Sequence, residues 1–251
     1  MPAVKPTNWQ KVLVIVGPTA SGKTGVAIGL AQKLGGEIIS ADSRAIYKSM
    51  DIGTAKPIPE EQAGVPHWGI DLVNPDERFT AADFKAYAEQ KIAEILARGH
   101  LPIIVGGTGL YVDALIYNYT FSEQAKTTQS DRQSLEHKFY TVGIKTDKAE
   151  LRERIALRAE QMFDNKIVQE TERLAKQYSF DLQSMRSNIY PIVWRMINGE
   201  LTREQAIAAA VLDDWHLAKR QLTWFKRNPS IIWLSRTEIV NFICASKNKL
   251  R

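Results

Sequence analysis

The residues best suited to chemistry form one run near the N-terminus, Gly17-Pro-Thr-Ala-Ser-Gly-Lys-Thr24. Its spacing, G-x-x-x-x-G-K-[ST], is that of the phosphate-binding P-loop, in which glycines let several backbone N–H groups point at one anion. Lys23 adds a full positive charge, and the Thr24 hydroxyl can hold a Mg²⁺ ion that bridges the phosphates. We therefore predict a di- or triphosphate site made of Gly17, Pro18, Thr19, Ala20, Ser21, Gly22, Lys23 and Thr24.

The sequence around this run supplies the elements that a P-loop requires. Residues 12–16 are apolar and predict a short buried strand, while residues 26–34 alternate small and apolar side chains, which favours a helix. A helix that begins at the end of the loop adds partial positive charge to the site. A glycine turn with only a structural role is the alternative, and the two flanking elements argue against it.

Two further strands are expected to end near this site. Residues 37–40 predict the first, and Asp42, Ser43 and Arg44 follow it, where open α/β sheets place their ligands. Residues 101–105 predict the second, which ends in Gly106-Gly-Thr108-Gly109. A P-loop ATPase usually ends such a strand with an aspartate that holds magnesium. Its absence argues against simple nucleotide hydrolysis.

The second half of the chain carries two helical patterns with basic side chains. Within residues 148–178, Arg154 and Arg158 are four apart and share one face, so they are either a solvated edge or a clamp on phosphate. We favour the clamp. A Thr202-x-x-Gln205 capping box precedes the other helix, which is predicted to end near Asn228. Its basic side chains, Lys219, Arg220, Lys226 and Arg227, recur seven apart, with the aromatic side chains of Trp224 and Phe225 among them. This pattern suits RNA binding, although such aromatic side chains more often belong to the hydrophobic core.

Composition sets the broad class. The chain has 251 residues, 44% apolar and 24% charged, with one cysteine, which fits a globular protein of a reducing cytoplasm. No apolar segment is long enough to span a membrane, so we expect no membrane partner. After residue 218 the chain has eight basic residues and only one acidic residue, Glu238. That imbalance predicts either a polyanionic partner, most simply nucleic acid, or a solvated tail.

These patterns predict an α/β fold, a P-loop NTPase-like parallel sheet flanked by helices, with a reduced helical insertion. Residues 1–116 form the first part of the core, and 117–147 form the reduced insertion or connector with a returning strand. Residues 148–251 complete the core and supply a C-terminal RNA-binding helix. We expect a monomer.

Several motifs in this order resemble the tRNA dimethylallyltransferase (tRNA isopentenyltransferase) family, over most of the chain. The most specific are Ile39-Ser-Ala-Asp-Ser-Arg44 and Met50-Asp-Ile-Gly-Thr-Ala-Lys-Pro57, which ordinary P-loop kinases lack. Three more follow: Phe79-Thr-Ala-Ala-Asp-Phe84, Val105-Gly-Gly-Thr108 and Lys219-Arg-Gln-Leu-Thr-Trp-Phe225.

The resemblance implies transfer of a dimethylallyl group from its diphosphate to N6 of adenosine 37 in the anticodon stem-loop, with the target base flipped out of its stack. It implies Asp42 as general base, Thr108 beside the acceptor adenine, and Lys23, the P-loop amides, Arg158 and a Mg²⁺ ion at Thr24 around the diphosphate. The tRNA contacts expected from the resemblance and the basic helix are Asp42, Ser43, Arg44, Ala45, Thr108, Arg186, Lys219, Arg220, Gln221, Thr223, Trp224, Lys226 and Arg227.

The chain also departs from the family pattern. Ala45 stands where the family commonly has glutamine, and the helical insertion that grips the anticodon stem-loop has no match between Tyr117 and Lys148. The run Met185-Arg-Ser-Asn-Ile-Tyr-Pro191 only partly resembles the family's Arg-x-x-Gly-Tyr-Arg motif. Three alternatives follow: an isopentenyltransferase for free adenine nucleotide, a P-loop small-molecule kinase, and an RNA-binding remnant without activity.

Overall fold

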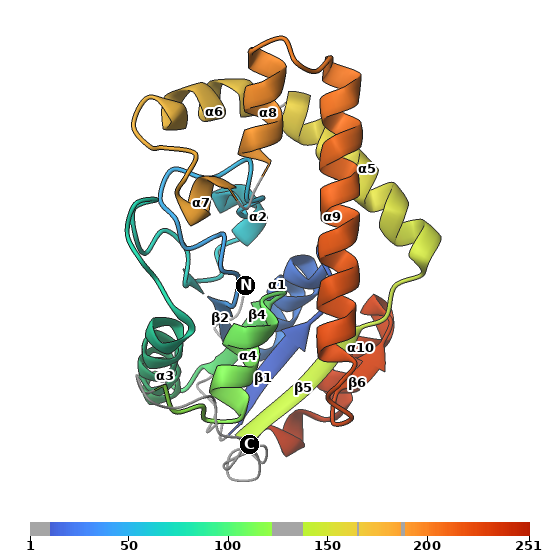
Figure 1. Cartoon of the computed structure of the whole chain (residues 1–251). Coiled ribbons are helices and arrows are strands. Elements are labelled where there is room, and N and C mark those ends of the chain that lie inside the picture. Colours follow the sequence, from blue (N-terminus) through green and yellow to red (C-terminus); the bar gives the residue numbers. More distant parts are fainter. Residues whose placement is uncertain (1–10, 122–137, 165, 187–188) are drawn as a thin grey trace.

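A computed structural model describes residues 11–121, 138–164, 166–186 and 189–251 (Figure 1). Its centre is a six-stranded sheet in the order β3-β2-β4-β1-β5-β6, and every pairing is parallel. The strands are β1 (Val12–Val16), β2 (Gly36–Ser40), β3 (His67–Trp68), β4 (Leu101–Gly106), β5 (Phe139–Ile144) and β6 (Ile232–Leu234). All residues of β1 and β4 are buried, as expected of strands covered on both faces. The predicted fold class is confirmed.

Helices cover both faces of this sheet. On one face, α1 (Lys23–Leu34) and α10 (Arg236–Ala245) pack Leu30 and Ile243 against the strands. On the other face, α3 (Ala81–Ala97) and α4 (Gly109–Ile116) bury Phe84 and Tyr111, whose rings stack at 4.4 Å. Thr80 caps α3 with a capping box completed by Asp83. The short α2 (Pro59–Gln62) and a final turn, η3 (Lys247–Lys249), lie outside these layers.

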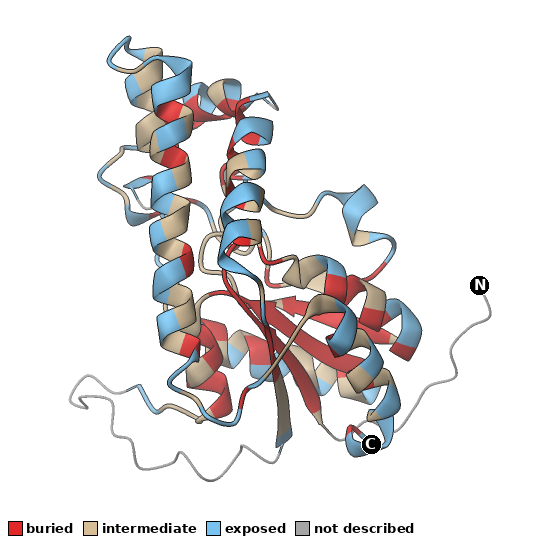
Figure 2. Ribbon diagram, turned by 90° about the vertical axis from the view of Figure 1, so that its right-hand side faces the viewer, coloured by how far each residue is buried: buried red, intermediate tan, exposed pale blue. Residues whose placement is uncertain are grey.

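A separate group of helices rises from the carboxyl end of the sheet (Figure 1). It comprises α5 (Lys148–Asp164), α6 (Ile167–Ala175), α7 (Gln183–Arg186), α8 (Tyr190–Ile197) and α9 (Arg203–Phe225). These helices have their own apolar core, to which the loop after β2 contributes Met50. Figure 2 shows the strands buried and the long rising helices exposed along much of their length.

Two predictions about helices need correction. Residues 148–178 are not one helix, because Lys166 takes a left-handed backbone with φ of 64° and separates α5 from α6. The long basic helix ends at Phe225, with Lys226 as its C-cap, so Arg227 lies beyond it. Most of the predicted connector, residues 122–137, lies outside the described residues. In the part of the chain that the structure describes, every helix is too short or too polar to cross a membrane.

Candidate active site

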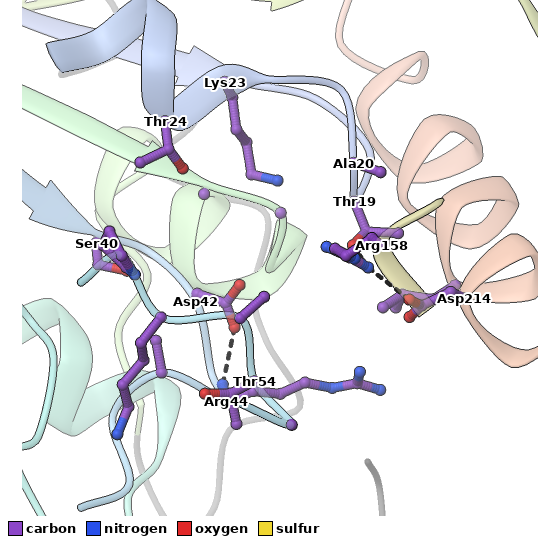
Figure 3. A pocket seen from close by; sticks show the side chains of 18 of the residues that line it. Thr19, Ala20, Lys23, Thr24, Ser40, Asp42, Arg44, Thr54, Arg158 and Asp214 are labelled. Atoms are coloured by element: carbon purple, nitrogen blue, oxygen red, sulfur yellow. Dashed lines mark hydrogen bonds and ion pairs between the residues drawn. The ribbon is translucent and has the colours of Figure 1, made fainter. Parts of the chain in front are cut away.

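One cavity of about 1210 Å³ lies over the carboxyl ends of the strands, between the sheet and the rising helices. The P-loop forms one wall, and the loops after β2 and β4 form the floor. Helices α5 and α9 form the wall next to the P-loop, which they contact, and the segment 51–58 closes the remaining side. Figure 3 shows Lys23 and Thr24 on one side of this space and Asp42 across from them.

The P-loop takes the shape that its glycines predict. Gly22, the residue before α1, has a φ of 84°, a conformation that side chains rarely adopt. Lys23 reaches back so that its Nζ donates to the Pro18 carbonyl at 3.2 Å. Burial lowers the pKa of Lys23 to about 8, because desolvation outweighs the nearby charge of Asp42. Ser21 Oγ is buried in this loop, and no described residue forms a hydrogen bond with it.

Asp42 and Thr108 come from neighbouring strands and meet at the floor of the cavity. Oδ1 of Asp42 accepts from the backbone N–H of Arg44 at 2.9 Å, which fixes the carboxylate. Thr108 Oγ1 accepts from the backbone N–H of Ser43 at 2.9 Å and donates to the Ser43 hydroxyl at 3.1 Å. The two loops approach so closely that a Cβ at Gly106 would lie 2.0 Å from the Ala41 carbonyl oxygen. This contact gives a packing reason for glycine where an ATPase would carry an aspartate.

The two arginines predicted as a phosphate clamp both contact the P-loop, but differently. Arg158 Nη2 donates to Thr19 Oγ1 at 2.6 Å and to Asp214 Oδ2 at 2.5 Å. Arg154 Nε donates to the Ala20 carbonyl at 2.7 Å, so its guanidinium is partly used in holding the loop's backbone. Both side chains still line the cavity. Both guanidiniums therefore remain candidates for contact with a bound anion.

Three residues beside the P-loop have contacts that the sequence analysis missed. Asp214 pairs with Arg158 across 56 positions, and Arg236 donates to the Ser21 carbonyl at 3.5 Å and to Glu150 at 2.5 Å. Gln221 was predicted to contact tRNA, but its Oε1 accepts from the Thr19 backbone N–H at 2.7 Å. Because these contacts join distant parts of the chain, no local pattern indicates them.

A carboxylate from the rising helices holds the segment 51–58. Glu170, on α6, accepts from the backbone N–H groups of Asp51, Ile52 and Gly53 at 3.0–3.1 Å and from the Tyr190 hydroxyl at 2.8 Å. Its exposure is 6%. A Cβ at Gly53 would lie 2.6 Å from the Tyr190 ring, so glycine is required there. Sequence reasoning treated Glu170 only as part of a helix.

The predicted tRNA contacts on α9 and just after it line two hollows, with the exception of Lys226. A second hollow of about 460 Å³ lies beside the first and is lined by His216, Lys219, Arg220, Thr223, Trp224 and Arg227. Arg220 and Trp224 line both hollows. Trp224 Nε1 donates to Asp113 at 2.9 Å, and the Arg227 guanidinium lies 4.8 Å from the Trp224 ring centroid. Phe225 is core, with 1% exposure, and exposed Lys226 lines neither hollow.

The remaining predicted contacts differ in what they can offer. Ala45 is buried at the cavity wall and has no polar side-chain atom. Arg44 also lines the cavity, and burial lowers its pKa. Arg186 is exposed at the rim on α7 and donates to the Asp181 carbonyl at 3.0 Å.

The donor set fits a magnesium ion held together with phosphate. The side chains of Thr24, Ser40 and Asp42 all line the cavity near Lys23 (Figure 3), and oxygen is the ligand that Mg²⁺ prefers. Within the described residues, His, Cys, Asp and Glu form no group of three that could hold a metal by themselves. Mg²⁺ commonly binds through few protein ligands, with phosphates and water completing its shell.

Comparisons with known proteins agree with this architecture. The family model described as IPP transferase matches residues 45–138 and 120–228. The two matches meet in the stretch where the sequence predicts a reduced insertion. A tRNA dimethylallyltransferase of Acetivibrio thermocellus is 35% identical over 288 aligned positions, covering 90% of this chain and 92% of that protein. One of Staphylococcus aureus is 35% identical over 291 positions, covering 91% and 94%. Both alignments exceed the 251 residues of this chain, so these relatives contain residues that it lacks.

Solved structures show the same relationship. The full-length tRNA isopentenylpyrophosphate transferase of Bacillus halodurans superposes with a TM-score of 0.84 at 31% identity, over 96% of this chain and 98% of that one. The Staphylococcus epidermidis tRNA isopentenylpyrophosphate transferase gives 0.83 at 32% identity, over 95% and 99%. A eukaryotic dimethylallyltransferase acting on tRNA shares the fold, with a TM-score of 0.76 at 22% identity over 96% of this chain and 77% of that one. With its P-loop, its parallel sheet and these matches, the chain belongs to the IPP transferase family, that of the tRNA dimethylallyltransferases.

Proposed function

We propose that this protein transfers a dimethylallyl group from dimethylallyl diphosphate to N6 of adenosine 37 in the tRNA anticodon stem-loop and releases diphosphate. The observation that carries the proposal is the arrangement in one cavity of an anion site and a carboxylate. Lys23 and the P-loop face Asp42 across a space that continues to the basic side of α9. A donor diphosphate and a nucleobase can meet there.

Asp42 acts on the acceptor side as the general base. The lone pair of an exocyclic adenine amine is delocalised into the ring, so the amine needs a base that takes its proton as the new bond forms. Asp42 is held by the Arg44 backbone N–H through Oδ1, which leaves Oδ2 for that proton. The paired hydroxyls of Thr108 and Ser43 lie beside it and offer hydrogen bonds to the adenine edge. Base flipping brings the target adenosine to this depth.

The P-loop and its arginine act on the donor side. The allylic C–O bond breaks, its electron pair leaves with the diphosphate, and the N6–C bond forms. Lys23, the P-loop N–H groups and Arg158 stabilise the negative charge that develops on the leaving diphosphate. The Thr24 hydroxyl would hold Mg²⁺ together with the phosphates, and the ion would supply further neutralising charge. Because a water molecule need not be activated, a magnesium-holding aspartate after β4 is not required.

Helix α9 guides the tRNA to this cavity. The smaller hollow is lined by His216, Lys219, Thr223 and Arg227, and Arg220 and Trp224 connect it to the larger cavity. Basic side chains beside an aromatic ring bind RNA phosphates and bases. One chain carries both the anion site and this face, so we propose that it works as a monomer.

Incubation with labelled dimethylallyl diphosphate and Mg²⁺, and with either bulk tRNA or AMP as acceptor, tests this function. We expect label in tRNA, at N6 of the adenosine next to the anticodon, and none in AMP. Label only in AMP would favour a free-nucleotide isopentenyltransferase. The variant Asp42→Asn serves as the matched control, because it keeps the size of the side chain and removes the base.

A further inference from the structure

A carboxylate lies at the anion site, where negative charge opposes binding. Asp214, on α9, lines the cavity and pairs with Arg158 at 2.5 Å. The same Arg158 nitrogen, Nη2, donates to Thr19 Oγ1 at 2.6 Å. Helix α5, helix α9 and the P-loop therefore meet at one guanidinium (Figure 3).

This ion pair is stronger than one on the protein surface. The side chains of Arg158 and Asp214 are only 25% and 19% exposed, so water screens their attraction less than it would outside. The charge of Asp214 also acts on Lys23 and Arg44, and raises the pKa of each against the effect of burial. Asp214 thus partly neutralises the cations that a diphosphate needs.

The hydrogen bonds to Thr19 and Asp214 both come from one nitrogen of the Arg158 guanidinium, Nη2. An arginine has five N–H donors in a fixed plane. Arg158 Nε is buried and has no hydrogen-bond partner among the described residues. A buried donor without a partner is costly, and because this nitrogen is buried, the guanidinium must turn away from Asp214 before a ligand oxygen can accept from it.

We propose that Asp214 holds Arg158 in the ligand-free protein and competes with diphosphate for it, which lowers the affinity for diphosphate and speeds release of the product. The inference rests on the proposed function, because it concerns the same anion site. Asp214 is a residue that sets affinity through Arg158, and it touches no reacting atom. Its neighbour Asp213 lines the same cavity, but among the described residues Arg158 forms its ion pair with Asp214 and not with Asp213.

Calorimetric binding of inorganic diphosphate in the presence of Mg²⁺, at constant ionic strength, tests this. We expect Asp214→Asn to bind inorganic diphosphate about ten-fold more tightly than wild type, since diphosphate must displace the Asp214 carboxylate from Arg158 and that attraction is more than about 1.4 kcal/mol at an effective dielectric constant of 20. Asp213→Asn, the matched control, removes the same charge from the next position and should gain less than about three-fold. In an Arg158→Ala background, most of the Asp214→Asn gain should disappear.

A gain of affinity separates this role from structural damage, which would weaken binding. Unchanged or weaker binding by Asp214→Asn would overturn the inference, and so would an equal gain from Asp213→Asn. If wild type itself failed to bind inorganic diphosphate, the proposed function would fall together with the inference. Binding by wild type with no response to Asp214→Asn would remove the inference alone.

Discussion

Replacing Glu170 by glutamine tests whether the rising helices set the shape of the cavity wall. In the folded protein, Oε2 accepts from the N–H groups of Asp51 and Ile52, and Oε1 accepts from the Gly53 N–H and the Tyr190 hydroxyl. A glutamine keeps the size but turns one acceptor into an NH₂ donor. Its best orientation places that NH₂ at Oε1, where the tyrosine hydroxyl can rotate to accept.

The Gly53 N–H is then left buried without an acceptor, at a cost of about 2 kcal/mol. The two hydrogen bonds that the remaining oxygen accepts from Asp51 and Ile52 are no longer strengthened by a negative charge, which costs about 1 kcal/mol each. We therefore expect Glu170→Gln to lower the free energy of unfolding by about 4 kcal/mol. Tyr190→Phe removes a single donor and should cost about 1 kcal/mol.

Urea unfolding followed by circular dichroism measures these differences. Glu172→Gln is the matched control, because it makes the same change on an exposed position of α6 and should stay within about 0.5 kcal/mol of wild type. Under conditions where Glu170→Gln remains folded, kcat/KM for tRNA should fall, while affinity for inorganic diphosphate should stay within about two-fold, since the P-loop is held by other contacts. A Glu170→Gln protein within 1 kcal/mol of wild type would refute the argument.

Four further outcomes are expected. Asp42→Asn should lower kcat by roughly 10²–10⁴, and near-normal turnover would exclude Asp42 as the base. Because the pKa of free Lys23 is about 8, affinity for dimethylallyl diphosphate should fall as the pH rises through 8, and Lys23→Arg should lack that step. Hydrogen bonds from Arg98, His100 and Trp68 lower the pKa of buried Glu37 to about 2 from 4.5, so the carboxylate stabilises the fold above pH 4.5 and this stabilisation is lost as the pH falls through 2. We expect Glu37→Gln to lower the free energy of unfolding by about 2 kcal/mol at pH 7, a value already reduced for the partial exposure of its partners. In acid, the stability of Glu37→Gln should approach that of wild type. If Lys219 and Arg227 contact tRNA phosphates, replacing both by alanine should flatten the log–log salt dependence of tRNA affinity by about one to two units, whereas alanine at Lys226, which lines neither hollow, should leave the slope unchanged.

The sequence by itself determined the features that depend on contiguous residues. The P-loop could be recognised because its glycines, Lys23 and Thr24 lie within eight positions, and its geometry is built mostly from its own backbone. The strand ends that deliver Asp42 and Thr108 could be predicted for the same reason, since apolar runs mark the strands and parallel strands end at one edge. The roles of these side chains in catalysis stay predictions.

Only the tertiary structure decided which partners the polar side chains of the helices contact. Arg154 and Arg158 share a helix face in the sequence, yet the first holds the Ala20 carbonyl and the second reaches Thr19 and Asp214. Glu170 contacts backbone groups 117 to 119 positions away. Gln221 likewise contacts the P-loop across 202 positions. Such pairings depend on where packing brings separate helices together, and the apolar periodicity of a single helix carries no information about the loop it will meet.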